Sequence, residues 1–288
     1  MRARNNRGGR GVAFLLMHLL SIGIEHIPPI TLGVIAICTA LYLGVIPPLD
    51  FSLSHVCLGL RGFLPSDSGA PTSSPYSDAV SSVLGRVFRG ARQGMQGRKF
   101  LFHPAWTLIA SSFYHVDDMH LYYNMCSWLV KARSIELNAG PEFLVLLVLV
   151  SVILTNATYL VLCVVSLLGT GILFDADSLI AEWMAPWGCA VGLSGVIFFL
   201  KTYLTMNEGE FPPVEGGLGL GFFSHFFRGE RKMAIWLELL LIQLLVPNVS
   251  FVGHLAGILA ALVFVKLRLG VRVRAVAEDL KQIRVRYG

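Results

Sequence analysis

The chain has 288 residues, of which 55% are hydrophobic and only 14% are charged, and its formal net charge is +5. An average soluble domain is roughly half apolar and one-quarter charged, so this composition excludes an ordinary soluble domain and indicates a polytopic membrane protein. The positive charge does not indicate a nucleic-acid partner, because the arginines gather at the chain ends and between apolar runs, where topology signals lie.

The chain begins with a basic segment that leads into an apolar stretch at residues 11–27. This stretch could be an interfacial helix, a seventh span, a cleaved signal peptide or a mitochondrial presequence. We favour the interfacial helix, because His18, Glu25 and His26 interrupt the apolar run. Residues 1–27 are therefore predicted to be a basic N-terminus with an interfacial amphipathic helix.

Six apolar stretches follow, each long enough, or nearly so, to cross roughly 30 Å of hydrocarbon. They lie at 30–46, 119–130, 143–168, 188–203, 233–246 and 250–267. The second stretch is short and polar, so it is credible only as a helix shielded inside a bundle. The sequence thus predicts an all-α membrane protein, with six transmembrane helices in a membrane domain at 28–268.

Charge predicts the sidedness of these spans. Lys and Arg clusters precede the first and fifth spans and follow the second and sixth, which places all four on one side, taken as cytosolic. An insertion at 61–100 in the first external loop is also basic, but long loops translocate largely regardless of charge. Residues 269–288 are predicted to be a basic cytosolic tail, either solvated or in contact with lipid headgroups.

A serine and a histidine, each flanked by glycines in its own apolar span, carry the functional prediction. Ser194 lies in the motif GLSG at 192–195, and His254 lies in GHLAG at 253–257. Polar groups at membrane depth are costly and are usually retained for function. A nucleophile type and a base type at comparable depth indicate hydrolysis inside the bilayer.

Polar groups on three separate spans are predicted to lie at the same depth in the membrane. Ser194 lies about six residues into the fourth span and His254 about four into the sixth, so both lie within roughly 10 Å of the external face. His120 and Asn124 begin the second span at the same end, four residues apart and hence on one helical face.

Small residues predict close contact between the fourth and sixth helices. Gly192 and Gly195 belong to a small stripe on the fourth span, and Gly253 and Gly257 belong to another on the sixth. Such stripes let helix backbones approach closely. The serine hydroxyl would then come within hydrogen-bond reach of the imidazole.

These residue types fit peptide hydrolysis by a serine–histidine dyad. His254 would take the proton from Ser194, whose oxygen attacks a peptide carbonyl, and the imidazolium would protonate the leaving amine. Asn124, His120 and the backbone N–H of Ser194 are available as donors to the oxyanion. No cofactor is needed, and no metal site is predicted: Asp117-Asp118 are expected to cap the second span, and the five cysteines are dispersed.

The chain resembles the rhomboid family of intramembrane serine proteases over about residues 28–268. The matching motifs, in family order, are HLYYN at 120–124, GLSG at 192–195 and GHLAG at 253–257. Closer similarity to the rhomboid-related protein 4 branch and its plant rhomboid-like relatives rests on IPPIT at 27–31, FYHVDD at 113–118, CAVGLS at 189–194 and VPNVSFVGH at 246–254.

The resemblance implies a six-transmembrane-helix rhomboid-like bundle with Ser194 as nucleophile, His254 as base, and His120 and Asn124 as oxyanion contacts. It implies transmembrane protein substrates within the lipid bilayer and the endoplasmic reticulum membrane, with a mitochondrial membrane as the alternative. The chain departs from the family at Trp106-Thr107, where many rhomboids have Trp-Arg, and at the 61–100 insertion. Relatives often carry C-terminal extensions for ubiquitin or other partners, and we expect no role in ubiquitin-linked degradation here.

Two functions of other classes compete with proteolysis. A non-proteolytic rhomboid-like scaffold could bind membrane clients in quality control, but such relatives typically lack the serine or the histidine. A transporter or channel could use Glu238 in the fifth span, but no paired charges or broken-helix repeats are visible. We interpret Glu238 as a helix contact and predict an intramembrane serine endopeptidase.

Overall fold

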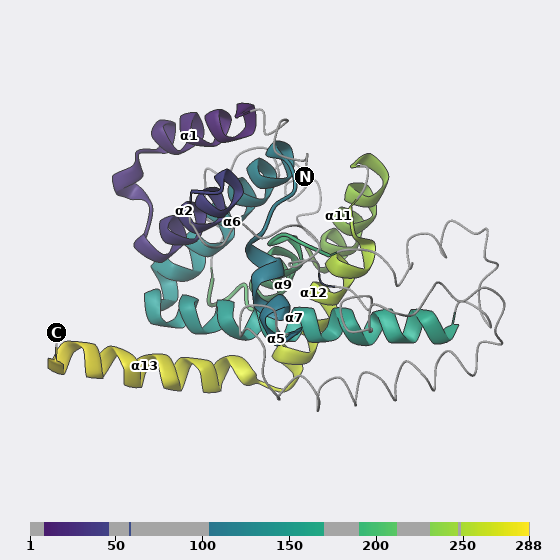
Figure 1. The fold of residues 1–288 in the computed structure, drawn as a ribbon. Helices are drawn as coiled ribbons and strands as arrows, with labels where there is room; N and C mark the ends of the chain where they lie inside the picture. The colour runs from purple at the N-terminus through teal and green to yellow at the C-terminus, as the bar shows by residue number, and fades with distance from the viewer. Residues whose placement is uncertain are drawn as a thin grey trace, which may run out of the picture.

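The computed structural model describes residues 9–45, 58, 104–169, 190–211, 231–246 and 249–287. These residues form helices, and one isolated backbone bridge joins Leu58 to Ala190 (Figure 1). The elements are α1 (Arg10–Ile22), the 3-10 turn η1 (Ile24–His26), α2 (Pro29–Leu43), α5 (Pro104–Phe113), α6 (Asp118–Ala139), α7 (Pro141–Gly169), α9 (Ser194–Met206), α11 (Arg231–Leu245), α12 (Phe251–Lys266) and α13 (Leu269–Tyr287). The 61–100 insertion lies outside the described residues.

Six of these helices correspond to the six predicted spans: α2, α6, α7, α9, α11 and α12. Judged by length and composition alone, Pro141–Ser166 within α7 is the one described helix that could cross a membrane by itself, with a mean hydropathy of 2.4. α12 and α13 meet the same criterion only as a pair bent by 78°, while α2 and α9 are apolar but shorter. Length and composition alone therefore identify α7 as a span, whereas the other five helices are assigned from their place in the packed bundle.

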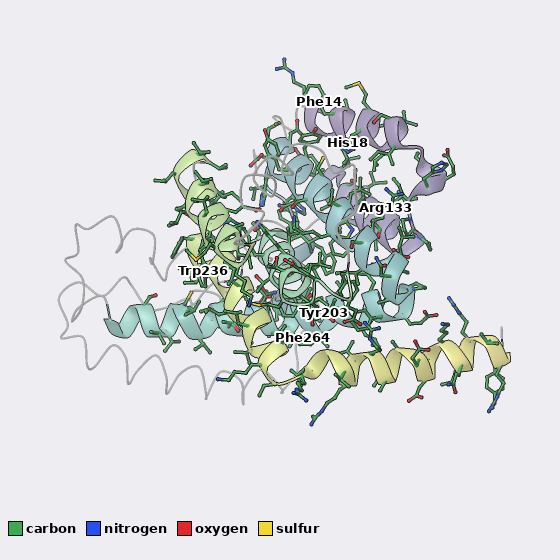
Figure 2. The ribbon with its side chains drawn as sticks, turned by 180° about the vertical axis from the view of Figure 1, so that it is seen from behind. Phe14, His18, Arg133, Tyr203, Trp236 and Phe264 are labelled. Atoms are coloured by element: carbon green, nitrogen blue, oxygen red, sulfur yellow. The ribbon has the colours of Figure 1, made fainter. Side chains whose placement is uncertain are left out.

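α12 packs against both α9 and α7, and this trio forms the centre of the bundle. Aromatic rings fill the contact: Phe264 lies edge-on to Phe199 at 5.4 Å and to Tyr203 at 5.7 Å between ring centroids. Figure 2 shows Tyr203 and Phe264 in the interior, whereas Phe14 lies on the outlying α1. Lipid tails are as apolar as these rings, so close packing rather than the hydrophobic effect holds such helices together.

A buried carboxylate fixes the start of α2 against α6. Glu136 accepts hydrogen bonds from the backbone N–H of Ile30 at 2.9 Å and from the N–H and hydroxyl of Thr31, both at 2.7 Å. The first N–H groups of a helix have no partner inside it, and a negative charge there also complements the helix dipole. At the other end of α2, Tyr42 donates to Asp118 at 2.7 Å. α2 therefore runs antiparallel to α6 over most of its length.

α1 also lies along α6 rather than across its end. Gly11 contacts the backbone of Asp118 at the first residue of α6, and the rings of Phe14 and Tyr122 are 6.2 Å apart. The chain then reaches Ile30, which is bonded to Glu136 near the other end of α6. Residues 11–30 thus follow α6 for most of its length.

The outer face of α1 is apolar. Its exposed large side chains are Phe14, Leu16, Met17 and Leu20. The polar side chains within α1 are His18, which is partly buried, and Ser21, which is exposed. The interfacial helix therefore stays a prediction, with a further membrane-embedded helix as its alternative.

The basic tail forms α13, which is tied to the ends of α7 and α9. Arg284 pairs with Glu142 at 2.9 Å, and Arg274 pairs with Glu210. The Arg274 guanidinium also lies 5.0 Å from the ring centroid of Phe143. The basic segment at 269–288 is thus a helix whose side chains also pair with the bundle.

Candidate active site

The turn at 190–193 sets the position of Ser194. Ala190 and Leu58 exchange two backbone hydrogen bonds of 2.9 and 3.2 Å, and the N–H of Gly192 donates to the carbonyl of Ser111 at 2.8 Å. Gly192 has a φ of +103°, a backbone conformation that favours glycine. Helix α9 therefore begins at Ser194, whose N–H is among the first of a helix and has no partner within it.

This start corrects the predicted depth of the serine. The apolar stretch at 188–203 placed Ser194 about six residues into a span, whereas it is the first residue of α9. The reason is that Ala190 pairs with Leu58 and Gly192 bonds to Ser111, so residues 190–193 form a turn. The serine consequently lies at a helix end, where a ligand can reach its hydroxyl and its backbone N–H together.

His120 and Asn124 on α6 face this turn. A side-chain carbon built on Gly192 would lie 2.6 Å from Nε2 of His120 and 3.5 Å from Nδ2 of Asn124. Asn124 is 7% exposed, and its buried Nδ2 has no hydrogen-bond partner. Leaving a buried donor unpaired costs about 1–3 kcal/mol, so such a group is commonly held for a ligand or water. Asp117 caps α6, as predicted, by accepting from the His120 N–H at 2.8 Å.

His254 lies in the first turn of α12 and is 4% exposed. Ser250 caps this helix by accepting from the N–H of Gly253 at 3.1 Å. The His254 ring packs on Phe198 with 4.8 Å between centroids, and its Nδ1 is buried without a hydrogen-bond partner. Across the ranges the structure describes, no carboxylate is paired with His254.

The backbones of α9 and α12 touch beside these two side chains. A side-chain carbon on Gly195 would lie 3.0 Å from the carbonyl oxygen of Gly253, and one on Gly257 would overlap the carbonyl oxygen of Gly195. Gly195 follows Ser194 and Gly253 precedes His254, so the contact joins the backbone next to one candidate residue to the backbone next to the other. The Ser194 hydroxyl and the His254 ring share no hydrogen bond here; catalytic hydrogen bonds are often long without substrate and tighten when it binds.

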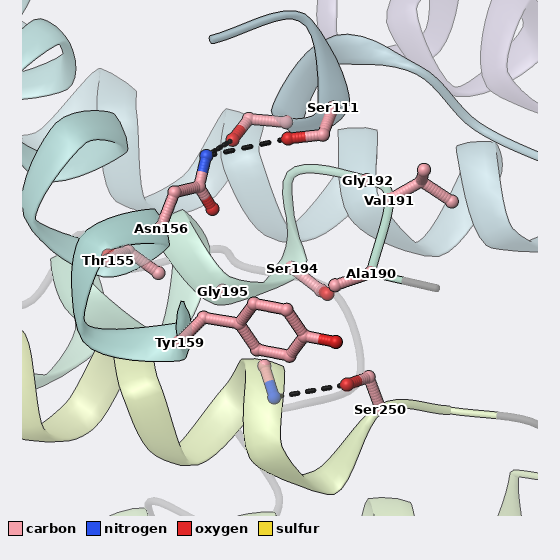
Figure 3. A pocket seen from close by; sticks show the side chains of 12 residues that line it. Ser111, Thr155, Asn156, Tyr159, Ala190, Val191, Gly192, Ser194, Gly195 and Ser250 are labelled. Atoms are coloured by element: carbon pink, nitrogen blue, oxygen red, sulfur yellow. Dashed lines mark hydrogen bonds between the residues drawn. The ribbon is translucent and has the colours of Figure 1, made fainter. Parts of the chain in front are cut away.

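A cavity of about 340 Å³, counted with the space at its mouth, opens beside Ser194 (Figure 3). It lies between α5, α7, α9 and the start of α12, and its polar lining includes Ser111, Ser112, Thr155, Asn156 and Tyr159. The side-chain amide of Asn156 donates to the hydroxyl of Ser112 at 2.9 Å and to the carbonyl of Leu108.

None of these cavity residues was predicted from the sequence. The available signal was the polar pair Thr155-Asn156 inside the otherwise apolar run of α7. Polar groups at such positions are usually buried against protein rather than exposed to lipid. Their partners on α5 belong to a segment that the sequence analysis treated as an external loop.

The comparisons with known proteins agree with this architecture. Residues 103–270 match the family described as "Rhomboid domain". The chain is similar to "Rhomboid-like protein 14, mitochondrial" of Arabidopsis thaliana, with 36% identity over 161 residues that cover 56% of this chain and 42% of that protein. It is also similar to "Rhomboid-related protein 4" of Homo sapiens, with 29% identity over 264 residues that cover 91% of this chain and 64% of that protein.

The chain thus spans less than two thirds of the length of either relative. The family match covers more than half of the chain and includes both Ser194 and His254. The curated relatives include rhomboid proteins from a plant and a mammal. The protein belongs to the rhomboid family, whose members are membrane-embedded helical bundles.

Proposed function

We propose that this protein is an intramembrane serine endopeptidase that hydrolyses peptide bonds of transmembrane proteins. The observation that supports the proposal is the backbone contact of Gly195, which follows Ser194, with Gly253, which precedes His254, and with Gly257. The unpartnered amide of Asn124 faces the same turn. A nucleophile, a base and a free donor from three helices therefore converge on one place.

In this mechanism His254 accepts the hydroxyl proton of Ser194 while the serine oxygen bonds to the carbonyl carbon of the substrate. The tetrahedral intermediate then breaks its C–N bond, and the imidazolium gives its proton to the leaving amine. Water repeats the sequence on the acyl-enzyme: His254 takes a proton from water as the hydroxide adds, and the imidazolium returns that proton to the Ser194 oxygen as the ester bond breaks. The products are a free amine, a carboxylic acid and the unchanged enzyme.

The oxyanion would receive donors from three sources. Asn124 supplies Nδ2, His120 supplies a ring N–H, and the start of α9 supplies the N–H of Ser194. Donors fixed at the site in advance need no reorganisation as the charge develops, and losing one typically reduces the rate about 10²–10³-fold. The unpartnered state of the Asn124 amide supports this role.

The proposed substrate is a membrane protein whose helix can unwind near the external face of the lipid bilayer. Every backbone group of a stable membrane helix is already satisfied, so helix-destabilising residues in the substrate would help to expose the scissile bond. The chemistry needs no cofactor and no metal. The endoplasmic reticulum membrane is the proposed location, with a mitochondrial membrane as the alternative that the name of the plant relative supports.

The fifth span offers little support for a transporter. Glu238 on α11 is paired with Lys201 on α9, so the expectation that the spans hold no paired charges is wrong; both side chains are largely buried. A buried carboxylate that is neutralised by a lysine acts as a contact between helices. Proteolysis therefore accounts for the arrangement better than ion transport does.

The test is cleavage of a single-span protein by the purified enzyme in proteoliposomes, followed by mass spectrometry of the fragments. Ser194→Ala and His254→Ala should each abolish cleavage. Ser151→Ala is the matched control, because Ser151 is buried but bonds only to its own helix at 2.8 Å. Cleavage that persists in folded Ser194→Ala protein would overturn the proposal, and loss of cleavage in the control would do the same. A folded wild type that binds membrane proteins but cuts none would favour the scaffold.

A further inference from the structure

We propose that Asn156, on α7, is a positioning residue that holds the turn before Ser194 in its reactive place; this inference rests on the proposed serine hydrolysis. The Asn156 amide bonds to residues of α5 and not to Ser194 or His254. It acts through α5 and the turn at 190–193. The sequence gives it no role, because it matches none of the catalytic motifs.

The first step is the contact between α7 and α5. The Asn156 amide nitrogen donates to the hydroxyl of Ser112 at 2.9 Å and to the carbonyl of Leu108, and Ser111 Oγ lies 3.5 Å away. Figure 3 shows this amide between the two helices, with its bonds drawn toward α5. One amide thus fastens the last turns of α5 to the middle of α7.

The second step leads from α5 to the turn. The carbonyl of Ser111 accepts the N–H of Gly192 at 2.8 Å. Gly192 has no side chain to anchor it, and its φ of +103° is held by its neighbours. A displaced α5 would therefore release the turn from which α9 and Ser194 begin.

The third step concerns the oxyanion contacts. Gly192 lies directly against the His120 ring and near the amide of Asn124. A shift of the turn would change the distance from the N–H of Ser194 to both side chains. Misplacing reacting groups by about 1 Å can reduce a rate about 10²-fold, so a small movement suffices.

The position of Asn156 next to the cavity of Ser194 links it to the reactivity of that serine as well as to the stability of the fold. It is 8% exposed and lines the same cavity as Ser194. Its neighbour Thr155 contacts Gly195 through its methyl group, 3.0 Å from where a side-chain carbon would lie. Two adjacent residues of α7 therefore hold the turn and the first residues of α9 from one side.

The experiment measures how fast an alkyl fluorophosphonate modifies Ser194 in the purified full chain. Asn156→Asp keeps the shape but removes the donor. Ser112→Ala removes one acceptor. The matched control is Asn138→Asp, because Asn138 makes a similar bond of 2.7 Å to the Ser134 carbonyl in its own helix, α6. Each variant is measured for its maximal modification rate, for the probe concentration giving half that rate, and for its thermal unfolding midpoint.

We expect Asn156→Asp to reduce the maximal rate about 10-fold or more while the half-saturating probe concentration changes less than about twofold. Ser112→Ala should give a smaller reduction. The double variant should be no slower than Asn156→Asp alone, because both changes break one network. The control should react like the wild type. If Asn156 had a purely structural role, Asn156→Asp would lower the thermal unfolding midpoint, and the modification rates of the variants would not follow this order.

An Asn156→Asp variant that folds and reacts at the wild-type rate would overturn this inference alone. So would an equal loss in Asn138→Asp. If Asn156→Asp does not fold, Ser112→Ala decides: a reduced rate at an unchanged unfolding midpoint supports the inference, and an unchanged rate overturns it. Wild-type protein that is folded but unmodified at Ser194 would overturn the proposed function, and this inference with it.

Discussion

The carbonyl oxygen of Gly195 lies against the α-carbon of Gly257, in the space that any side chain at position 257 would fill. Two helices that carry the proposed nucleophile and base are therefore joined backbone to backbone. Gly257→Ala should push α12 away from α9 and reduce cleavage of a reconstituted substrate at least about 10²-fold, because the reacting groups would be misplaced. Gly33→Ala on α2 is the control, since nothing lies within 4 Å of its added carbon. Equal activity of the two variants would contradict the proposed contact.

Gly192→Ala tests the turn itself. The added carbon would meet the His120 ring at 2.6 Å, and the backbone would keep a φ that residues other than glycine rarely adopt. Strain of this kind costs about 1–3 kcal/mol, and the turn or the ring must move to relieve it. We expect cleavage to fall about 10²-fold. Gly209→Ala, which meets no atom within 4 Å, should cleave normally; a fully active Gly192→Ala would show that the turn is not critical.

Removal of the oxyanion donors should affect the chemical step. Asn124→Ala and His120→Ala should each lower kcat about 10²–10³-fold and leave KM nearly unchanged, because the donors act mainly on the developing charge. Steady-state kinetics in proteoliposomes provide the measurement. Tyr123→Phe is a control from the same helix, with a side chain that is 60% exposed. A raised KM with unchanged kcat would assign these residues to substrate binding instead.

The ion pair of Lys201 with Glu238 should contribute to stability rather than to chemistry. Lys201→Met leaves a carboxylate buried without a partner, which typically costs about 3–5 kcal/mol. The double variant Lys201→Met/Glu238→Leu should recover most of that loss, since no buried charge remains. Reversible unfolding in mixed detergent micelles measures both. A single variant as stable as the wild type would show that water or another group satisfies Glu238.

The position of α1 along α6 predicts where the amino-terminal end lies. If α1 is embedded beside α6, Gly9 should face the side of the membrane opposite to Tyr287. Gly9→Cys and Tyr287→Cys, each in a background without the native cysteines, should react with a membrane-impermeant thiol reagent from opposite sides of sealed vesicles. Reaction of both from the same side would instead support the interfacial helix predicted from the sequence.

The spans and the contact between the helices that carry Ser194 and His254 could be predicted from the sequence because their signals are local. Apolar runs mark the helices, and the glycines next to each functional residue mark the contact. The length of α6 could not be predicted in this way, since Lys131 and Glu136 lower its hydropathy. In the structure Lys131 donates to Ser127 at 2.7 Å and Glu136 accepts from the start of α2, so the polar groups are satisfied inside the bundle.

The start of α9 and the network around Asn156 depend on contacts between distant parts of the chain. Residues 188–193 resemble part of an apolar span, and the pairing of Ala190 with Leu58 and of Gly192 with Ser111 shows that the chain makes a turn before Ser194. Asn156 meets its partners on α5 across 44–48 residues of sequence. No periodicity or motif connects positions so far apart, so these features require the folded chain.

We expect the His254 ring to activate the Ser194 hydroxyl. Peptide mass spectrometry of the folded protein after treatment with an alkyl fluorophosphonate tests this activation. The phosphonyl group should be found on Ser194 in the wild type and should be absent from His254→Ala and from heat-unfolded protein. Modification that persists at an equal rate in folded His254→Ala, or a folded wild type that is never modified at Ser194, would contradict the account.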